Sequence, residues 1–347
     1  MNAIAVAGHL CLDIIPRLGS TASVAPGQLI EVGALTMTAG GSVANTGGAL
    51  AALGARVVPI ATVGHDAIAQ ILCEKLGELG LDTAGLVTIV GGSTSYSLVI
   101  ESPGQDRTFW HHTGTNATFD GSAVVPADVD IFHLGYPPLL PALVAHDAAP
   151  LHRLLEAARR SGATTSVDLA VVDPTSAVGA LNWPAILEAI APVTDVLTPS
   201  LDDLTSALGI TESFSFDLID RLSNWLIAAG VGVVAISAGS HGLFIRTAGA
   251  ARLAAGGSAL AAVSREWAER ELRWAPVEVE TVLTTNGAGD AASAGLLYGL
   301  AAGADLEYAG LLATAAAAAH IGGARPTPAA VCALAPALES LWERTPS

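Results

Sequence analysis

Short apolar runs typical of β-strands alternate with stretches of helical periodicity along most of the chain. The strand-like runs cover residues 3–8, 56–64, 130–135, 164–170, 231–239 and 242–247, and the helical stretches cover residues 42–54, 67–80, 151–162 and 217–230. Each of these helices ends in a glycine, the expected C-cap residue, before the next apolar run. This alternation favours an α/β fold with three layers (α/β/α), in which helices cover both faces of a mostly parallel sheet.

Two segments interrupt the alternation. Residues 14–38 and 88–118 are rich in polar and β-forming residues and lack a helical period. The sequence Ser-Pro-Gly-Gln-Asp at 102–106 is a turn signal that splits the second segment into two runs. We expect both segments to form a small β-sheet that projects as a lid from one domain spanning residues 1–347.

Composition and charge narrow the functions that this fold can serve. Hydrophobic residues make up 51% of the chain and charged residues 14%, and the formal net charge is −17. A chain this acidic is repelled by nucleic acid and by anionic membranes, so neither is expected as a partner. If the protein binds a phosphate, backbone N–H groups, a few arginines and a metal must hold it.

The expected compartment follows from the cysteines and the apolar runs. Three widely spaced cysteines form neither a zinc pattern nor a disulfide framework, which fits a reducing compartment. The apolar N-terminal run lacks a basic start and a cleavage signal, so it is interpreted as a strand. The longest uncharged run, residues 291–304, is too short to span a bilayer. A cytoplasmic location is therefore expected.

The sequence Asn286-Gly287-Ala288-Gly289-Asp290 lies between a predicted strand, VEVETVL (277–283), and a long apolar helix. Glycines expose the backbone, and the N–H groups of a helix N-terminus favour an anion. Asp290 would repel a phosphate, but it would serve as a base that takes a proton from an attacking hydroxyl. The structural alternative is a glycine turn in which Asp290 is the helix N-cap.

A second glycine pair occurs near the start of the chain. Gly40-Gly41 opens a predicted helix, and Asn45 follows one turn later. Bare backbone lets a small polyol lie close to the chain, and an asparagine amide both donates to and accepts from hydroxyls. The alternative is an ordinary turn between a strand and a helix.

Together these stretches resemble the two signatures of the ribokinase-like family, the PfkB-type carbohydrate kinases. The first signature is matched by Gly40, Gly41, Asn45, Leu53 and Gly54, and the second by Thr285, Gly287, Ala288, Gly289, Asp290 and Gly295. The resemblance extends over nearly the whole chain. It implies the ribokinase-like fold, ATP as phosphate donor and Mg²⁺ as cofactor.

The resemblance also implies roles for individual residues. Sugar binding is implied for Asp13, which follows Gly8 in a Gly-x-x-x-x-Asp pattern, and for Arg107 in the lid. For both, an ordinary surface residue is the structural alternative. The implied nucleotide-binding residues are Ser200, Ser237, Gly239, Gly242 and Asn286.

Two positions depart from the family pattern. Thr284 replaces the first Asp of the second signature, which often helps to hold a monovalent cation, so activation by potassium is not carried over to this chain. The Asn-x-x-Glu motif that organises magnesium reads Ser200-Leu201-Asp202-Asp203. Asp203 keeps a carboxylate on a shorter side chain, and either Asp202 or Asp203 would compensate for the missing Glu. The resemblance implies that Asp203 contacts magnesium through water.

We therefore expect an ATP-dependent kinase that phosphorylates a primary hydroxyl of a small sugar or sugar-like molecule. The resemblance further implies a lid that pairs between two subunits of a homodimer. A nucleoside kinase of the adenosine or pseudouridine type is the nearest alternative, with a base stacked on Phe109, Trp110 or Tyr96. A non-catalytic sugar- or nucleotide-binding protein is the alternative from another functional class.

Overall fold

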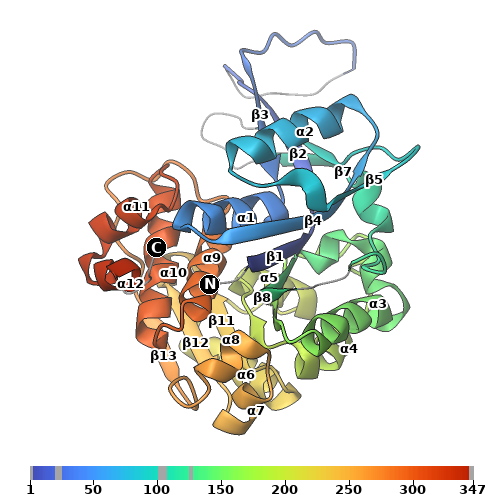
Figure 1. Cartoon of the computed structure of the whole chain (residues 1–347). Helices are drawn as coiled ribbons and strands as arrows, with labels where there is room; N and C mark the ends of the chain where they lie inside the picture. The colour runs from blue at the N-terminus through green and yellow to red at the C-terminus, as the bar shows by residue number, and fades with distance from the viewer. Residues whose placement is uncertain (1–2, 20–25, 101–107, 125–127, 344–347) are drawn as a thin grey trace.

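The computed structural model describes residues 3–19, 26–100, 108–124 and 128–343. Within them lies a central nine-stranded sheet with the strand order β13-β12-β11-β10-β9-β8-β1-β4-β5 (Figure 1). Its strands are β1 (Ala3–Gly8), β4 (Arg56–Gly64), β5 (Leu86–Ile89), β8 (Val129–Gly135), β9 (Thr164–Asp168), β10 (Val196–Leu197), β11 (Val233–Ser237), β12 (Leu243–Thr247) and β13 (Glu271–Trp274). The pairings from β5 to β11 are parallel, and β12 and β13 join in antiparallel pairs.

Helices cover both faces of this sheet. Their bounds are α1 (Ser42–Leu53), α2 (Ala67–Glu78), α3 (Pro141–Arg160), α4 (Trp183–Ile190), α5 (Leu201–Leu208), α6 (Phe216–Ala229), α7 (Ala250–Ala254), α8 (Ser258–Ala262), α9 (Ala288–Ala301), α10 (Leu306–Ile321), α11 (Pro328–Leu334) and α12 (Glu339–Glu343). In the described part of the chain, no helix combines the length and the apolar character needed to cross a membrane.

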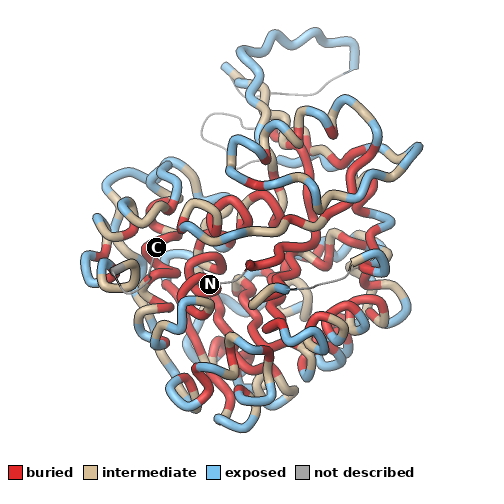
Figure 2. The backbone as a smooth tube through the Cα atoms, viewed as in Figure 1, coloured by how far each residue is buried: buried red, intermediate tan, exposed pale blue. Residues whose placement is uncertain are grey.

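The hydrophobic core is divided in two by the sheet. In β1, Ile4 and Val6 belong to the core with α1, α9 and α10, whereas Ala5 and Ala7 belong to the core with α3, α4 and α6. Successive side chains of a strand point to opposite faces, so β1 contributes to both cores and is buried throughout (Figure 2). This arrangement confirms the predicted three-layer α/β/α fold.

The predicted helix ends are also confirmed. Gly54, Gly80, Gly162 and Gly230 follow their helices with φ between 82° and 121°, a backbone conformation that glycine adopts without steric cost. The strand predicted at residues 277–283 is wrong, because no strand occurs between β13 and α9. The Val-Glu alternation there does suit a strand, but a strand also needs a neighbour to bond, and these residues join no sheet.

A second, four-stranded sheet has the order β3-β2-β6-β7 and lies beyond the β1 and β4 side of the central sheet (Figure 1). Its strands are β2 (Cys11–Pro16), β3 (Leu35–Gly40), β6 (Tyr96–Ile100) and β7 (Thr108–His112). It therefore begins earlier than the expected range 14–38. Within the expected range 88–118, residues 88 and 89 pair with β4 in the central sheet instead. We call this second sheet the small sheet.

Candidate active site

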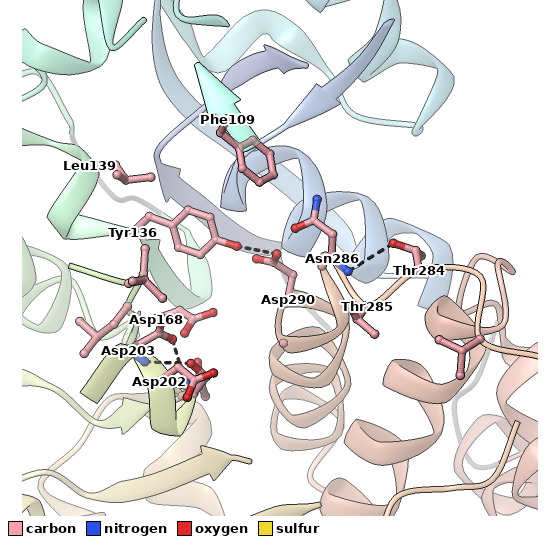
Figure 3. A pocket seen from close by; sticks show the side chains of 18 of the residues that line it. Phe109, Tyr136, Leu139, Asp168, Asp202, Asp203, Thr284, Thr285, Asn286 and Asp290 are labelled. Atoms are coloured by element: carbon pink, nitrogen blue, oxygen red, sulfur yellow. Dashed lines mark hydrogen bonds between the residues drawn. The ribbon is translucent and has the colours of Figure 1, made fainter. Parts of the chain in front are cut away.

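A cavity of about 1040 Å³ lies where the carboxyl ends of β8 and β9 meet the N-termini of α5 and α9. Ligands of open α/β sheets commonly bind at this end of the strands. Phe109 of the small sheet contributes to the lining (Figure 3). Four carboxylates also line the cavity: Asp168, Asp202, Asp203 and Asp290.

The glycine motif forms the first turn of α9. Gly287 is the N-cap, with a left-handed backbone (φ 83°), and no side chain caps this end of the helix. Nothing lies within 4 Å of a Cβ placed on Gly289, so the backbone there is open to the cavity. Asp290 is the third helical residue, so its alternative assignment as N-cap is wrong. The exposed first turn has the geometry of an anion site.

A histidine from α10 holds the loop before α9. The Nε2 atom of His320 lies 2.6 Å from the carbonyl oxygen of Asn286. A Cβ on Gly287 would lie 3.0 Å from the same Nε2 atom, so glycine also provides the space for this contact. The loop that carries Asn286 is thereby fixed next to the cavity.

Asp290 is 3% exposed and accepts three side-chain hydrogen bonds. Thr46 Oγ1 donates to Oδ1 at 2.7 Å, and Asn45 Nδ2 and Tyr136 OH donate to Oδ2 at 3.1 and 2.6 Å. Burial raises the pKa of Asp290 above its ordinary value, and the three donors oppose that rise. Asn45 thus joins the first glycine motif directly to the second, across 245 residues.

Thr46 and Tyr136 were not identified from the sequence. Thr46 follows Asn45 on α1, and nothing in its local pattern distinguishes it from a core threonine. Tyr136 follows β8 in a left-handed conformation (φ 62°, ψ 50°), and its N–H donates to the carbonyl oxygen of Asp168 at 3.0 Å. This conformation costs about 1–2 kcal/mol for a residue other than glycine. It places the phenol in the cavity, pointing at Asp290 (Figure 3).

Asp168 was also missed; it lies inside the strand predicted at residues 164–170 and ends β9 in the structure. It is 4% exposed, and burial, followed by the charges of Asp290 and Asp203, raises its pKa well above the ordinary value. Its Oδ2 atom accepts a long, 3.5 Å hydrogen bond from Ser293 Oγ. Asp168 thus lies at the end of a buried strand and between two other acids, where a carboxylate does not help packing. We therefore regard it as a candidate functional residue.

Asp203 takes part in a capping box at the start of α5. Its Oδ2 accepts from the N–H of Ser200 at 2.8 Å, and its own N–H donates to Ser200 Oγ at 3.0 Å. Burial raises the pKa of Asp203. The two residues predicted for magnesium and nucleotide binding are therefore locked together at the cavity wall.

The residues present fit a magnesium ion that keeps part of its water shell. Mg²⁺ usually binds one or two carboxylates, phosphate oxygens and several waters. The described residues contain no group of three His, Cys, Asp or Glu side chains that would hold a metal ion by themselves. Burial destabilises the ionised form of Asp203, and a nearby cation would stabilise it again. Asp203 is therefore suited to contact such an ion through one of its waters.

Three of the predicted sugar-binding residues, Asp13, Gly40 and Gly41, lie together where β2 and β3 pair. A Cβ on Gly40 would lie 2.2 Å from Asp13 Oδ2, and one on Gly41 would lie 2.6 Å from His9 Nδ1. Gly41 also has φ 85°. At both positions a side chain would collide with these close neighbours, so only glycine fits. Ser97, beside Asp13 on β6, bonds His111 on β7.

The predicted nucleotide-side loop lies beside the large cavity. Ser237 bridges to Ser200 and lines a small adjoining pocket with Gly289. Gly239 and Gly242 follow in a turn after β11 and have positive φ values of 53° and 94°. A Cβ on Gly242 would lie 2.0 Å from the carbonyl oxygen of Trp274, so packing alone explains that glycine. Arg107 lies outside the described residues.

Comparisons with known proteins agree with this arrangement. The model of the pfkB family of carbohydrate kinases matches residues 1–329. A 1-phosphofructokinase from Rhodobacter capsulatus is 29% identical over 319 residues, which cover 88% of this chain and 87% of the relative.

Solved structures share the fold at low sequence identity. Arabidopsis thaliana ribokinase, solved with ribose and ATP, has a TM-score of 0.73 at 18% identity, over 96% of this chain and 98% of that one. A Burkholderia thailandensis nucleoside kinase, solved with inosine, has a TM-score of 0.68 at 19% identity, over 99% and 100%. The chain therefore belongs to the pfkB family of carbohydrate kinases and is a phosphotransferase whose acceptor is an alcohol group.

Proposed function

We propose that this protein transfers the γ-phosphate of ATP to a primary hydroxyl of a small, uncharged sugar or sugar-like molecule. The observation that carries the proposal is the position of Asp290. Its carboxylate is buried at the exposed first turn of α9 and is bonded by Asn45 from the first glycine motif. A base, an anion site and a polyol-binding motif are thus adjacent.

Each of these groups has a distinct part in the reaction. The acceptor hydroxyl gives its proton to Asp290 while its oxygen attacks the γ-phosphorus. The N–H groups of Ala288, Gly289 and Asp290 stabilise charge on the phosphoryl group as it moves. Asp13, Gly41 and Asn45 orient the acceptor, and positioning provides much of the catalysis in phosphoryl transfer. Closure of the small sheet over the cleft excludes water.

ATP, the phosphate donor, and the metal ion belong to the side of the cavity that α5 and α9 form. Ser200, Ser237, Gly239, Gly242 and Asn286 are assigned to the nucleotide. Asp203 would hold Mg²⁺ through water, and the ion would supply positive charge that neutralises the phosphates of ATP. Thr284 occupies the position where relatives often have an acid, so no monovalent cation is included.

An uncharged acceptor is favoured by the charges around the cavity. The lining contains four carboxylates and, among the residues that the structure describes, neither lysine nor arginine. A sugar phosphate would bring further negative charge beside these acids, at an electrostatic cost. We therefore favour an uncharged sugar, even though one relative is named 1-phosphofructokinase.

A nucleoside is the second candidate acceptor. Phe109 lines the cavity and offers a surface for a base, and a structural neighbour was solved with inosine. Trp110 follows Phe109 on β7 and so points to the other face of the small sheet. Tyr96 packs with the core that contains α1, and it contacts the ring of His112, which also lies on that other face. Phe109 is thus the one residue of the three that supports this candidate.

ADP formation with a panel of ribose, fructose, their phosphates and nucleosides tests the proposal. Wild type should turn over an uncharged acceptor in preference to its phosphate ester. Asp290→Asn should lower kcat by about 10²–10⁴-fold while nucleotide binding is retained. If both proteins bind ligand and neither consumes ATP with any acceptor, the protein is instead a sensor.

We further propose that the protein forms a homodimer through the small sheet and that it is located in the cytoplasm.

A further inference from the structure

Tyr136 supplies the shortest of the three hydrogen bonds to Asp290. Its hydroxyl lies 2.6 Å from Oδ2, against 2.7 Å for Thr46 to Oδ1 and 3.1 Å for Asn45 to Oδ2. Asn45 and Thr46 are neighbours on α1, whereas Tyr136 approaches from the end of β8 on another side of the cavity (Figure 3). The carboxylate is therefore held from two directions.

The donors are distributed unevenly over the two oxygens. A carboxylate oxygen offers about two lone-pair directions. Tyr136 and Asn45 together occupy both lone-pair directions of Oδ2. Among the hydrogen bonds that the structure describes, Oδ1 receives only the one from Thr46. Oδ1 therefore keeps one direction for a further proton.

We propose that Tyr136 is a positioning residue that fixes the orientation of Asp290 and reserves Oδ1 as the oxygen that accepts the proton from the acceptor. This inference rests on the proposed kinase function. In the reaction, the acceptor O–H bond breaks and its proton passes to Oδ1, while the acceptor oxygen forms a bond to the γ-phosphorus. The bond from that phosphorus to the bridging oxygen breaks, and its electron pair remains on ADP.

The surroundings explain why a third donor is needed. Asp168 at the end of β9 and Asp203 on α5 present negative charge toward Asp290, and His320 on α10 is the basic side chain that faces it. Asp202 also lines the cavity. Burial favours the protonated form of Asp290, which is useless as a base. A donor that stabilises the ionised form opposes this effect.

Tyr136 is suited to this part because it does not compete for the proton. Burial first, then the charges of Asp290 and Asp168, raise the pKa of its phenol well above the ordinary value. The phenol therefore remains a hydrogen-bond donor across the range in which Asp290 titrates. The left-handed backbone at Tyr136 is consistent with a functional constraint, since such strain clusters at active sites.

Tyr136→Phe removes the hydroxyl and keeps the ring. We expect the acidic limb of the kcat/KM profile to move to higher pH by about one unit. At a pH below both limbs the rate should fall about tenfold relative to wild type, with recovery above the new limb and an unchanged KM for ATP. Tyr298→Phe is the matched control, because its hydroxyl bonds one side chain, Trp342, away from the cavity. An acidic limb that does not move in Tyr136→Phe overturns the inference.

A carbon-13 NMR titration of the aspartate carboxyl groups tests the inference without turnover. The resonance of Asp290 is assigned as the one that is missing from the spectrum of Asp290→Asn. Tyr136→Phe should raise the midpoint of the Asp290 resonance, and Tyr298→Phe should leave it unchanged. An unchanged midpoint in Tyr136→Phe contradicts the inference even in an active enzyme. If the midpoint rises but wild type consumes no ATP with any acceptor, the kinase function fails while the contact of Tyr136 with Asp290 stands.

Discussion

At the scale of single residues, the cavity contains more negative charge than its surroundings can neutralise. Asp168, Asp203 and Asp290 are each less than 9% exposed, and burial is the largest cause of the raised pKa of each. Asp290 has three donors, whereas the described residues give the Asp168 carboxylate a long contact from Ser293 and a backbone hydrogen bond from Leu169. Asp168 is therefore the acid whose ionisation should cost the folded protein most.

Asp168→Asn should stabilise the protein at high pH. The pKa of Asp168 is higher in the folded than in the unfolded protein, so its cost is absent below about pH 3.8 and complete above the folded-state pKa. Without nucleotide or metal, the variant should gain about 1–3 kcal/mol of unfolding free energy at pH 8 and almost nothing near pH 4. Urea unfolding at several pH values measures this difference.

The control is Asp173→Asn. Asp173 is an exposed acid whose pKa is lowered by hydrogen bonds from Thr175, so its ionised form favours folding instead. This variant should not be stabilised at pH 8. An Asp168→Asn variant that is equally or less stable than wild type at pH 8 would show that Asp168 is satisfied as an anion.

At the scale of elements, glycine and alanine allow α9 and α10 to pack very closely. A Cβ on Gly295 would lie 2.7 Å from the Cα of Ala313, and one on Gly299 would lie 2.9 Å from the Cα of Ala309. Backbone therefore meets backbone along this pair of helices. The glycines that weaken α9 as an isolated helix are required by its contact with α10, and this contact anchors the helix that carries Asp290.

Gly295→Ala should destabilise the fold by about 1–3 kcal/mol, because the new methyl group meets backbone that cannot rotate away. The matched control is Gly77→Ala on α2, an exposed helical glycine with nothing within 4 Å of the added Cβ. Higher helix propensity should stabilise that variant by up to about 1 kcal/mol. Thermal unfolding compares the two, and a Gly295→Ala variant as stable as wild type would contradict the close packing.

At the scale of the whole molecule, the small sheet and the segment before β3 carry apolar residues that the described part of the chain leaves exposed. Leu29, Ile30 and Val32 lie in the segment that leads into β3 and are 100%, 43% and 47% exposed. Leu35, the first residue of β3, is 54% exposed. Figure 2 shows the backbone of this segment as exposed. Several exposed large apolar residues in one short segment are typical of an interface between proteins. It supports the proposal that two subunits pair through their small sheets.

We expect the mass of a dimer in light scattering at micromolar concentration. Leu29→Asp combined with Leu35→Asp should shift the mass toward that of the 34.8 kDa chain, because charge is costly inside an interface. Val90→Asp is a control, since Val90 is also exposed (87%) but lies beside the central sheet, after β5. A wild type that remains a monomer at this concentration would contradict pairing.

The sequence alone determined the α/β/α fold, the helix ends at glycine and the family, because these depend on local periodicity, on backbone conformations open to glycine, and on short motifs. It also pointed to Asp290 and Asn45, which belong to those motifs. The tertiary structure decided what surrounds Asp290. Thr46 comes from α1, Tyr136 from the residue after β8 and Asp168 from the end of β9, and they meet only because the sheet brings the ends of its strands together. The failed strand at 277–283 has the same cause, since strand pairing depends on a neighbour that local sequence does not specify.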